Sequence, residues 1–371
     1  MGSKQNVAEK SSVAPGILAT STALPANVVD QHALAAMLRT LWTDHDSGSR
    51  RWHTTFDQIQ HSVHVERRYL ALPVSDYPAL NTFGKANAAW LRAAPELAVT
   101  AARRALTAAQ MSPSAIDHLF FVTGTGIATP SVDARIVNAL ELRSDVRRTP
   151  IFGLGCAGGV AAVGRAADVL RGAPEQTALI VSVELCSLTF QRDDPSIANI
   201  IASALFGDGA AAVILGGANR LSRTAAQPPR ILATRSVFYR GTESMMGWDV
   251  VDSGFKIVLS PAIPKLVRDH LRGDLDAFLA EQGLNRSAIA RWIAHPGGNR
   301  VLEAIAQALE LPPQALESSW RLLAATGNLS SASVLFVLHD LLERDAPQCG
   351  ELGIMLAMGP GFGAELALLQ W

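Results

Sequence analysis

The sequence has few of the features that identify disulfide-rich, nucleic-acid-binding or membrane proteins. Its 371 residues include 3 cysteines, Cys156, Cys186 and Cys349, and none of them forms a CxxC pair. This content excludes a disulfide framework and predicts a chain that works in a reducing, cytoplasmic compartment. The formal net charge is −1, so the charge balance gives no indication of nucleic acid or an anionic membrane as a partner.

Long apolar runs and several familiar catalytic motifs are also missing. The first dozen residues are polar and contain no apolar segment of the kind found in secretory signals. The longest apolar stretch, residues 332–342, is interrupted by His339 and Asp340, so we expect no membrane span. No GxSxG, HExxH or Walker sequence is present, and hydrolase, metalloprotease and nucleotide-hydrolase functions therefore lack support.

What the sequence does contain is typical of a well-buried globular protein. It is 49% hydrophobic and 18% charged, with 29 Gly and 19 Pro. The length is sufficient for two domain-sized cores. Residues 217–230 are polar and rich in turn formers, so we predict two domains, residues 1–218 and residues 219–371.

Short apolar segments alternate with helical patterns in both halves. A long amphipathic helix is expected over residues 85–110. Strands are expected near residues 119–125, 149–155, 178–184, 210–216, 231–238, 255–260 and 291–296, and helices near 157–172, 262–282, 299–309 and 330–344. This alternation predicts an α/β sheet covered on both faces. In each half a strand is followed by small residues, a reactive residue and a helix, which suggests a pseudo-duplicated fold that brings Cys156 and Asn328 together.

Cys156 lies in the segment GLGCAGG, residues 153–159, between a predicted strand and a predicted helix. Backbone N–H groups at a helix start favour a thiolate, so we expect a lowered pKa and a nucleophilic sulfur. Two other interpretations compete with this one. Cys156 can be an ordinary small buried hydrophobe. The segment also matches G-x-G-x-x-G, and Glu184 follows at about the spacing of a ribose contact, as in a dinucleotide site.

His295 and Asn328 have similar glycine-flanked settings. His295 ends a predicted strand in WIAHPGGN, a position suited to a group that faces a substrate, although most histidines have structural roles. Asn328 lies in ATGNLSSAS, where Asn can simply cap a helix. Ser330 or Ser331 could provide that cap instead and leave the Asn328 amide free.

The three segments GLGCAGG, AHPGG and GNLSSAS, in this order and spacing, resemble the thiolase-fold condensing enzymes, and more narrowly the type III polyketide synthases of the chalcone synthase superfamily. The segments ALFGDGAAAVILG, TGIATPSVDAR and MGPGFGAEL extend the resemblance over nearly the whole chain. It implies an α/β thiolase-like fold of two pseudo-duplicated αβαβα-layered halves. A dinucleotide site has no use for His295 or Asn328, so the resemblance disfavours that interpretation.

The resemblance implies a mechanism with three catalytic residues. Cys156, paired with His295, takes an acyl group from a CoA thioester. Asn328 and His295 then hold the thioester carbonyl of malonyl-CoA while CO2 leaves, and the enolate attacks the acyl group on Cys156. Acyl-CoA and malonyl-CoA are substrates, and no metal, no cofactor and no obligatory acyl carrier protein are expected.

Other positions resemble the substrate cavity, the CoA entrance and the dimer contact of this family. The substrate-binding positions are Thr129, Cys186, Thr189, Phe206, Ile257, Ser330, Gly359, Pro360 and Gly361, and the CoA-binding positions are Arg67 and Arg68. The resemblance also implies a homodimer in which Thr129 crosses to the partner. The segments VELCSLTF, TGIATPS and MGWDVVDSGFKIVLS, which contain Cys186, Thr129 and Ile257, look like those of bacterial enzymes that extend long fatty acyl-CoA starters to alkylpyrones or alkylresorcinols.

Two alternatives within the thiolase fold are weighed against this assignment. A ketoacyl synthase III-like enzyme of fatty acid initiation would use the same three residues with an acyl carrier protein. A non-catalytic partner subunit would typically lack the nucleophile, whereas all three residue types are present here.

Overall fold

A nine-stranded mixed sheet runs through the computed structural model, which describes residues 11–43, 50–222, 228–345 and 347–371. The strand order is β11-β12-β13-β8-β1-β7-β6-β4-β5. The strands are β1 (Gly16–Ala23), β4 (His118–Val122), β5 (Arg147–Ile151), β6 (Thr177–Leu185), β7 (Asp208–Gly216), β8 (Arg230–Phe238), β11 (Ile289–Ala294), β12 (Leu352–Gly359) and β13 (Gly363–Gln370). Most of β6, β7 and β12 is fully buried, as their continuous apolar sequences predict.

The two halves of this sheet repeat one pairing pattern. β1 pairs antiparallel with β7, β7 pairs antiparallel with β6, and β6 pairs parallel with β4. In the second half β8 pairs antiparallel with β13, β13 pairs antiparallel with β12, and β12 pairs parallel with β11. The halves meet at the pair Gly16–Arg230 of β1 and β8. The pseudo-duplicated α/β fold expected from the sequence is confirmed.

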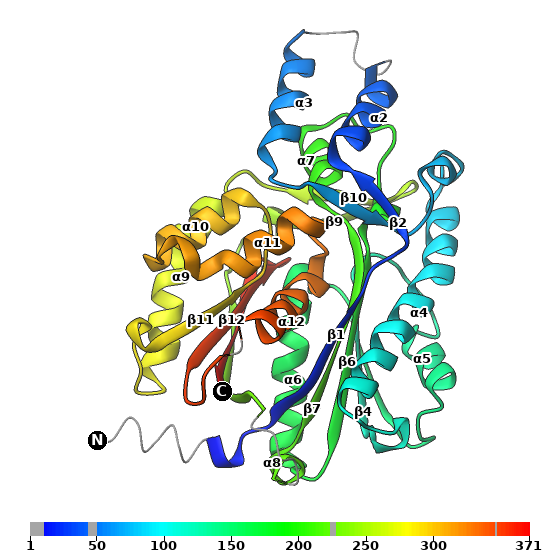
Figure 1. Cartoon of the computed structure of the whole chain (residues 1–371). Helices are drawn as coiled ribbons and strands as arrows, with labels where there is room; N and C mark the ends of the chain where they lie inside the picture. The colour runs from blue at the N-terminus through cyan, green and yellow to red at the C-terminus, as the bar shows by residue number, and fades with distance from the viewer. Residues whose placement is uncertain (1–10, 44–49, 223–227, 346) are drawn as a thin grey trace.

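Helices form three layers around and between the halves of the sheet (Figure 1). α4 (Phe83–Ala108) and α5 (Asp133–Leu140) cover one outer face, where buried alanines of α4 share a core with β6 and β7. α9 (Ile263–Ala280) and α10 (Asn299–Leu309) cover the other outer face and share a core with β12 and β13. α6 (Gly158–Gly172) and α12 (Ser333–Arg344) lie between, in a third core. The resulting α–β–α–β–α order is that of a thiolase-like fold.

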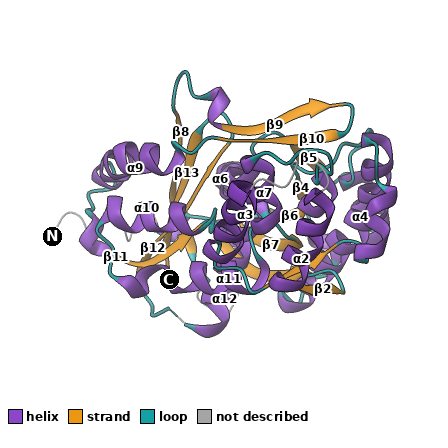
Figure 2. Ribbon diagram, turned by 90° about the horizontal axis from the view of Figure 1, so that it is seen from above, coloured by secondary structure: helices purple, strands orange, loops and turns teal. Residues whose placement is uncertain are grey.

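Further elements lie at one end of the sheet, above α6 and α12 (Figures 1 and 2). They are α2 (Gln31–Thr43), α3 (Arg50–Ser62), α7 (Ile197–Leu205), α11 (Glu317–Thr326), the pair β2 (Asn27–Asp30) and β3 (Arg67–Leu70), and the hairpin of β9 (Met246–Val251) and β10 (Gly254–Leu259). The α3 and α7 helices pack against one another, and β10 contacts α7. These elements enclose the end of the sheet at which the reactive residues lie.

Most of the elements expected from the sequence are present. The helix predicted over residues 85–110 is α4, and the strand predicted over 178–184 is β6. The sequence patterns do not predict α7, α11 or β9. The predicted domain boundary at residues 218 and 219 lies in the short helix α8 (Ala218–Leu221), before β8 begins the second half of the sheet. Within the described ranges, no helix combines the length and the apolar content that a membrane span requires.

Candidate active site

Cys156 lies in a tight turn between β5 and α6, and packing explains the glycines around it. Gly155 has a φ of +44°, and a Cβ there would lie 2.7 Å from a ring carbon of Pro360. A Cβ on Gly158 would lie 2.7 Å from the side chain of Val122. The glycines therefore allow other segments of the chain to pack closely against this turn. A dinucleotide site would instead need open space for a phosphate here.

Glu184, the candidate ribose contact in the dinucleotide interpretation, is enclosed in the protein interior. It is 0% exposed, and its carboxylate accepts hydrogen bonds from the Gly124 N–H and the Thr125 hydroxyl, both at 2.9 Å. The Ser331 hydroxyl donates to its second oxygen. Burial raises the pKa of Glu184. A ribose cannot reach this carboxylate, so the dinucleotide interpretation is wrong.

The Cys156 thiol is buried, at 7% exposure, and lies 3.8 Å from the Ser330 hydroxyl, to which it donates. Burial raises the pKa of the Cys156 thiol to about 12; nearby Glu184 adds to the rise, whereas hydrogen bonds with Ser330 and Asn328 oppose it. The lowered pKa that we expected from the helix start is therefore wrong for the thiol on its own. Removal of the thiol from water outweighs the N–H groups of one short turn.

His295 follows β11, and its backbone N–H donates to the carbonyl of Leu356 at 2.8 Å. Its imidazole is 4% exposed, and neither ring nitrogen has a hydrogen-bond partner within the part of the chain that the structure describes. Burial lowers the pKa of His295 to about 3. The ring is therefore neutral, with one N–H donor and one free lone pair available to a ligand in the cavity.

Asn328 is held by both its backbone and its side chain. Its N–H donates to the Leu205 carbonyl at 2.8 Å, and its carbonyl accepts from the Gly207 N–H at 3.0 Å. The side-chain Oδ1 accepts from the Ser330 N–H at 2.8 Å, which fixes the orientation of the amide. The Nδ2 donates to the Gly297 carbonyl over a long distance of 3.4 Å, and a hydrogen bond from the Asn328 side chain also lowers the pKa of Cys156. Asn328 therefore does accept a cap-like hydrogen bond, contrary to the expectation that Ser330 or Ser331 replaces it, but its donor group stays available.

These three side chains line one cavity of about 630 Å³. Phe206, Ile257, Ser330 and Pro360 line it too, so four of the predicted substrate-binding positions lie at the cavity. Gly359 and Gly361 flank Pro360 in the chain without being among the lining residues. A Cβ on Gly359 would lie 2.4 Å from the Leu154 carbonyl, which explains the glycine next to the Cys156 turn.

The remaining predicted substrate positions do not line this cavity. Cys186 and Thr189 are buried in one 3₁₀ turn after β6. Burial raises the pKa of Cys186, and nearby groups that include Cys156 raise it further. Thr129 is exposed at the surface before Pro130. We therefore find no contact of Thr129, Cys186 or Thr189 with the cavity as it is formed by one chain.

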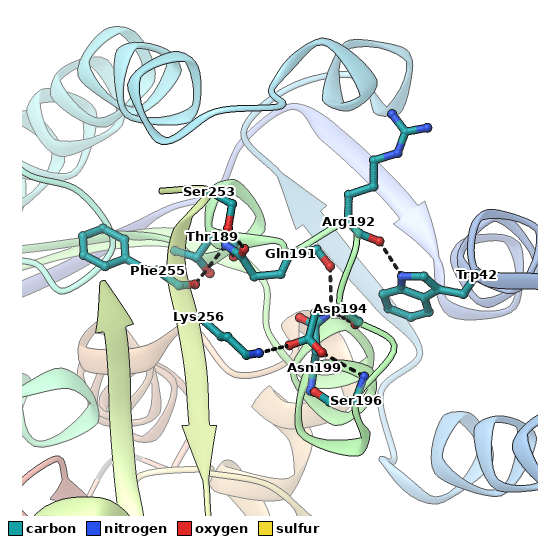
Figure 3. A network of polar contacts seen from close by, with 10 residues as sticks. All are labelled: Trp42, Thr189, Gln191, Arg192, Asp194, Ser196, Asn199, Ser253, Phe255 and Lys256. Atoms are coloured by element: carbon teal, nitrogen blue, oxygen red, sulfur yellow. Dashed lines mark hydrogen bonds and ion pairs between the residues drawn. The ribbon is translucent and has the colours of Figure 1, made fainter. Parts of the chain in front are cut away.

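A polar network holds the loop that carries Thr189 (Figure 3). The amide of Gln191 donates to the carbonyls of Thr189 at 3.2 Å and Phe255 at 3.3 Å, and it accepts from the Ser253 hydroxyl at 2.6 Å. Asn199 donates to the Gln191 carbonyl at 2.8 Å. These bonds tie the loop to the hairpin of β9 and β10 and to α7, the elements that form the cavity wall.

The two arginines predicted to bind CoA have different environments. Arg67 is exposed, lies 3.9 Å from Glu66, and does not line the cavity. Arg68 is 2% exposed and donates to the carbonyls of Ser203 and, at 3.3 Å, Phe206. Burial lowers the pKa of Arg68 to about 9, and the nearby Asp208 opposes this shift. The assignment of Arg68 to CoA is wrong, because its guanidinium is enclosed below the cavity wall and cannot reach a ligand.

Sequence reasoning also missed one wall of the cavity. Ile197, Ile201 and Leu205 line it from α7, at the i, i+4 and i+8 positions of one helix face. Ile59 and Val63 of the α3 region also line it. The spacing of the three apolar residues in IANIIASAL is the signal that could have revealed α7.

The chain is similar throughout its length to known proteins. Models of the N-terminal and C-terminal domains of chalcone and stilbene synthases match residues 3–219 and 231–370. The chain is 47% identical to a 1,3,6,8-tetrahydroxynaphthalene synthase of Streptomyces peucetius subsp. caesius, over 100% of this chain and 96% of the relative. It is 32% identical to a 3,5-dihydroxyphenylacetyl-CoA synthase of Streptomyces toyocaensis, over 83% of this chain and 80% of the relative.

Solved structures agree in fold over nearly the whole chain. The 1,3,6,8-tetrahydroxynaphthalene synthase of Streptomyces coelicolor, described as a bacterial type III polyketide synthase, superposes with a TM-score of 0.88 at 29% identity, covering 96% of this chain and 99% of the other. The PKS-I of the brown alga Ectocarpus siliculosus superposes with a TM-score of 0.89 at 26% identity, covering 96% and 98% of the two chains.

Proposed function

The chain belongs to the family of chalcone and stilbene synthases and is a type III polyketide synthase that condenses malonyl-CoA, and within this family we propose that it extends a long-chain fatty acyl starter and cyclises the product to an alkylpyrone. The ketoacyl synthase III and non-catalytic alternatives are therefore set aside. One observation carries the proposal: a thiol, a neutral imidazole and an oriented amide line one cavity that also has an aliphatic wall.

In the loading step, Cys156 is the nucleophile and His295 is the base. The lone pair of the neutral imidazole accepts the proton of Sγ, and the sulfur attacks the thioester carbonyl of acyl-CoA. A new carbon–sulfur bond forms to Cys156 and the bond to CoA breaks. The proton held by His295 then leaves with the CoA thiol, which restores the neutral ring.

In the extension step, Asn328 and His295 act as hydrogen-bond donors. The Nδ2 of Asn328 and an N–H of His295 donate to the thioester oxygen of malonyl-CoA. The bond to the carboxylate breaks, CO2 leaves, and the electron pair remains as an enolate stabilised by those donors. The enolate carbon attacks the acyl carbonyl, and Cys156 leaves as the thiolate with its bond to the acyl group broken.

The aliphatic wall supports a long-chain starter. Ile59, Val63, Ile197 and Ile201 all line the cavity, and no carboxylate or amine is among its lining residues within the described ranges. Each methylene buried against such a wall contributes about 0.8 kcal/mol to binding. Ile257, predicted to open space for the starter, lines the same cavity.

The apolar lining also supports lactone closure. An enol oxygen of the extended chain attacks the thioester carbon, and the sulfur leaves, so that a pyrone is released with no need for water. An alkylresorcinol would instead require hydrolysis of a thioester in a cavity with few polar groups.

A second candidate comes from the relative named as a 1,3,6,8-tetrahydroxynaphthalene synthase, at 47% identity. A tetrahydroxynaphthalene carries no alkyl chain, so a protein with this activity would build its product from malonyl units alone. The same three residues would act, but the aliphatic wall would have no acyl chain to hold.

The two candidates predict different products. The protein is incubated with malonyl-CoA alone, and with malonyl-CoA plus hexanoyl-, dodecanoyl- or palmitoyl-CoA, and the products are measured by mass spectrometry. We expect masses that increase with the starter and a preference for the two longer chains. A naphthalene product from malonyl-CoA alone, unchanged by the acyl-CoAs, would instead establish the second candidate.

A matched pair of variants tests the aliphatic wall. Ile201→Trp should fill part of the cavity and shift the preference toward hexanoyl-CoA. Val169→Trp introduces the same side chain on α6, away from the cavity, and should leave the preference unchanged. Equal chain-length profiles in both variants would refute the location of the starter.

We further propose that the protein is a homodimer. β5 is the last strand of the sheet, and most of its residues are exposed. Phe152, directly after it, is 54% exposed, and Ile127, near Thr129, is 43% exposed. Exposed sheet edges with apolar neighbours are normally covered. A second copy would cover this surface and bring its Thr129 close to the first chain.

A further inference from the structure

The α7 helix ends beside Asn328, and its last carbonyls are bonded by other parts of the chain. The last carbonyls of any helix have no donor within the helix and need partners from elsewhere. The carbonyls of Ser203 and Phe206 accept from the Arg68 guanidinium, the latter at 3.3 Å. The Leu205 carbonyl accepts from the Asn328 N–H at 2.8 Å. The end of α7 is therefore bonded to β3 through Arg68 and to the active site through Asn328.

The backbone N–H of Gly207 has two alternative acceptors at this junction. Gly207 lies four residues after Ser203, so a longer α7 would direct this N–H to the Ser203 carbonyl. In the structure the N–H donates instead to the Asn328 carbonyl at 3.0 Å, which completes a parallel bridge between Phe206 and Asn328. Because Arg68 bonds the Ser203 carbonyl, α7 ends here and the Gly207 N–H stays available to the bridge.

The aliphatic part of Arg68 lies against both chain segments of this bridge. A Cβ on Gly327, the residue before Asn328, would lie 3.4 Å from Cγ and Cδ of Arg68. A Cβ on Gly207 would lie 3.7 Å from the same Cγ. The side chain of Arg68 therefore borders the end of α7 and the segment that leads into Asn328.

The two bonds to α7 are the only hydrogen bonds of the Arg68 side chain within the described ranges. Nη1 makes both, whereas Nε and Nη2 have no partner there. The side chain is 2% exposed and does not line the cavity, so it makes no contact with a ligand. Burial lowers the pKa of Arg68 to about 9, which leaves it charged at pH 7. A cation at this position is favourable, because the end of a helix carries partial negative charge.

We propose that Arg68 is a positioning residue for the extension step, because it ends α7 and so holds the backbone bridge that places Asn328. The inference rests on the proposed function, in which the Nδ2 of Asn328 donates to the malonyl thioester. Without Arg68, the Ser203 carbonyl competes for the Gly207 N–H and the bridge weakens. The Nδ2 of Asn328 then loses its alignment with the thioester oxygen. Acylation of Cys156 does not use this donor, so the two steps should respond differently.

Separate assays of the two steps test the role of Arg68. Acylation by dodecanoyl-CoA is followed by mass spectrometry of the intact protein, and malonyl-CoA consumption by the acylated protein is then measured. Arg68→Met should be acylated within about threefold of the wild-type rate, and kcat for malonyl-CoA should fall by about 10- to 100-fold with KM little changed, the range for a displacement of about 1 Å. Arg68→Lys should recover most of this loss, since one ammonium nitrogen can donate to both carbonyls as Nη1 does.

Arg286→Met is the matched control. Arg286 donates to the carbonyl of Leu309, the last residue of α10, at 2.6 Å, but it does not line the cavity. Both steps should proceed at the wild-type rate in this variant. Hydrogen exchange adds a measurement that is independent of activity. The peptide that contains Gly207 should exchange faster in Arg68→Met than in the wild type, and should be unchanged in Arg286→Met.

Two results would overturn the role of Arg68. One is a folded Arg68→Met protein that consumes malonyl-CoA at the wild-type rate. The other is an equal loss in both steps, which a purely structural role predicts. If Arg68→Met does not fold, Arg68→Gln, a neutral amide of shorter reach, takes its place and the same results decide.

Failure of the proposed function gives different results. Wild-type malonyl-CoA consumption by Asn328→Ala would overturn the role of Asn328 and not the bridge that Arg68 holds. A wild-type protein that dodecanoyl-CoA does not acylate would overturn the long-chain starter, and the variants are then compared with the starter that the wild type accepts.

Discussion

Replacing His295 with glutamine should make Cys156 unreactive near neutral pH. Burial raises the pKa of Cys156 to about 12 and lowers the pKa of His295 to about 3. Each charge is therefore unfavourable on its own. When the proton moves from Sγ to the imidazole, two opposite charges form in one poorly solvated cavity, and their attraction offsets the cost of burying them. Glutamine has a similar size but cannot accept the proton.

The size of the expected loss of Cys156 reactivity in His295→Gln follows from the fraction of the thiol that is ionised. A thiol with a pKa of about 12 is ionised in about one molecule in 10⁵ at pH 7, whereas an unperturbed thiol of pKa about 8.5 is about 3% ionised. Without His295, Cys156 should thus react on the order of a thousandfold more slowly than an unperturbed thiol. The rate should rise about tenfold per pH unit up to pH 10, because the thiolate fraction does.

The assay is alkylation by iodoacetamide between pH 6 and pH 10, followed by peptide mass spectrometry. The exposed Cys349 serves as the internal reference in each sample. In the wild type, Cys156 should react faster than Cys186 and Cys349 at pH 7, and in His295→Gln it should react at least 100-fold more slowly than Cys349. His339→Gln is the matched control, because His339 bonds to Thr20 and does not line the cavity.

The reasoning would be refuted by a His295→Gln protein in which Cys156 reacts at the wild-type rate at pH 7. That result would mean that a group other than His295 stabilises the thiolate. A slow Cys156 in both His→Gln variants would point to a general loss of structure, which the rate at Cys349 and the circular dichroism spectrum would reveal.

Three further predictions concern other parts of the molecule. Asn328→Ala should still be acylated by acyl-CoA but consume malonyl-CoA about 100- to 1,000-fold more slowly; unchanged consumption would contradict the role of its Nδ2. Arg68→Met should lower the free energy of unfolding in urea by about 1–3 kcal/mol, because it removes the donor that bonds the Ser203 and Phe206 carbonyls. The exposed Arg67→Met should change it by less than about 0.5 kcal/mol, and an equal effect of the two would contradict the structural role of Arg68. Light scattering should give roughly twice the chain mass of 39.4 kDa, and a fully active monomer would exclude the homodimer.

The sequence points to the three proposed catalytic residues because each has a strong local signature. Cys156 and His295 lie beside glycines after a strand, as predicted, and a local pattern is sufficient to find them. Asn328 follows Gly327 after the α11 helix, so the strand predicted before it is wrong. A local pattern is also sufficient for buried strands such as β6, whose apolar run predicts its place in a covered sheet. Family resemblance then supplies the order in which the segments meet.

Burial and long-range contact cannot be seen in a local pattern. Arg68 follows another arginine in an apparently exposed, charged segment, yet its partners Ser203 and Phe206 are 135 and 138 residues away. The pKa of Cys156 depends on how completely the second half covers the thiol, which no motif encodes. The positions 129 and 186 resemble cavity positions, but the cavity within one chain is formed instead by residues of α3, α7 and the β9–β10 hairpin.

The duplicated fold explains how the site is assembled and why its glycines matter. Cys156 comes from the first half of the chain, and His295 and Asn328 come from the second. The two halves meet where α6 packs against the start of α12, and a Cβ on Gly159 would lie 2.3 Å from the Ser331 carbonyl there. Any side chain at this position would push apart the two helices that hold the thiol and the amide. The close approach of the helices therefore sets the distance between Cys156 and Asn328, so the same contact that joins the halves of the fold also forms the proposed active site.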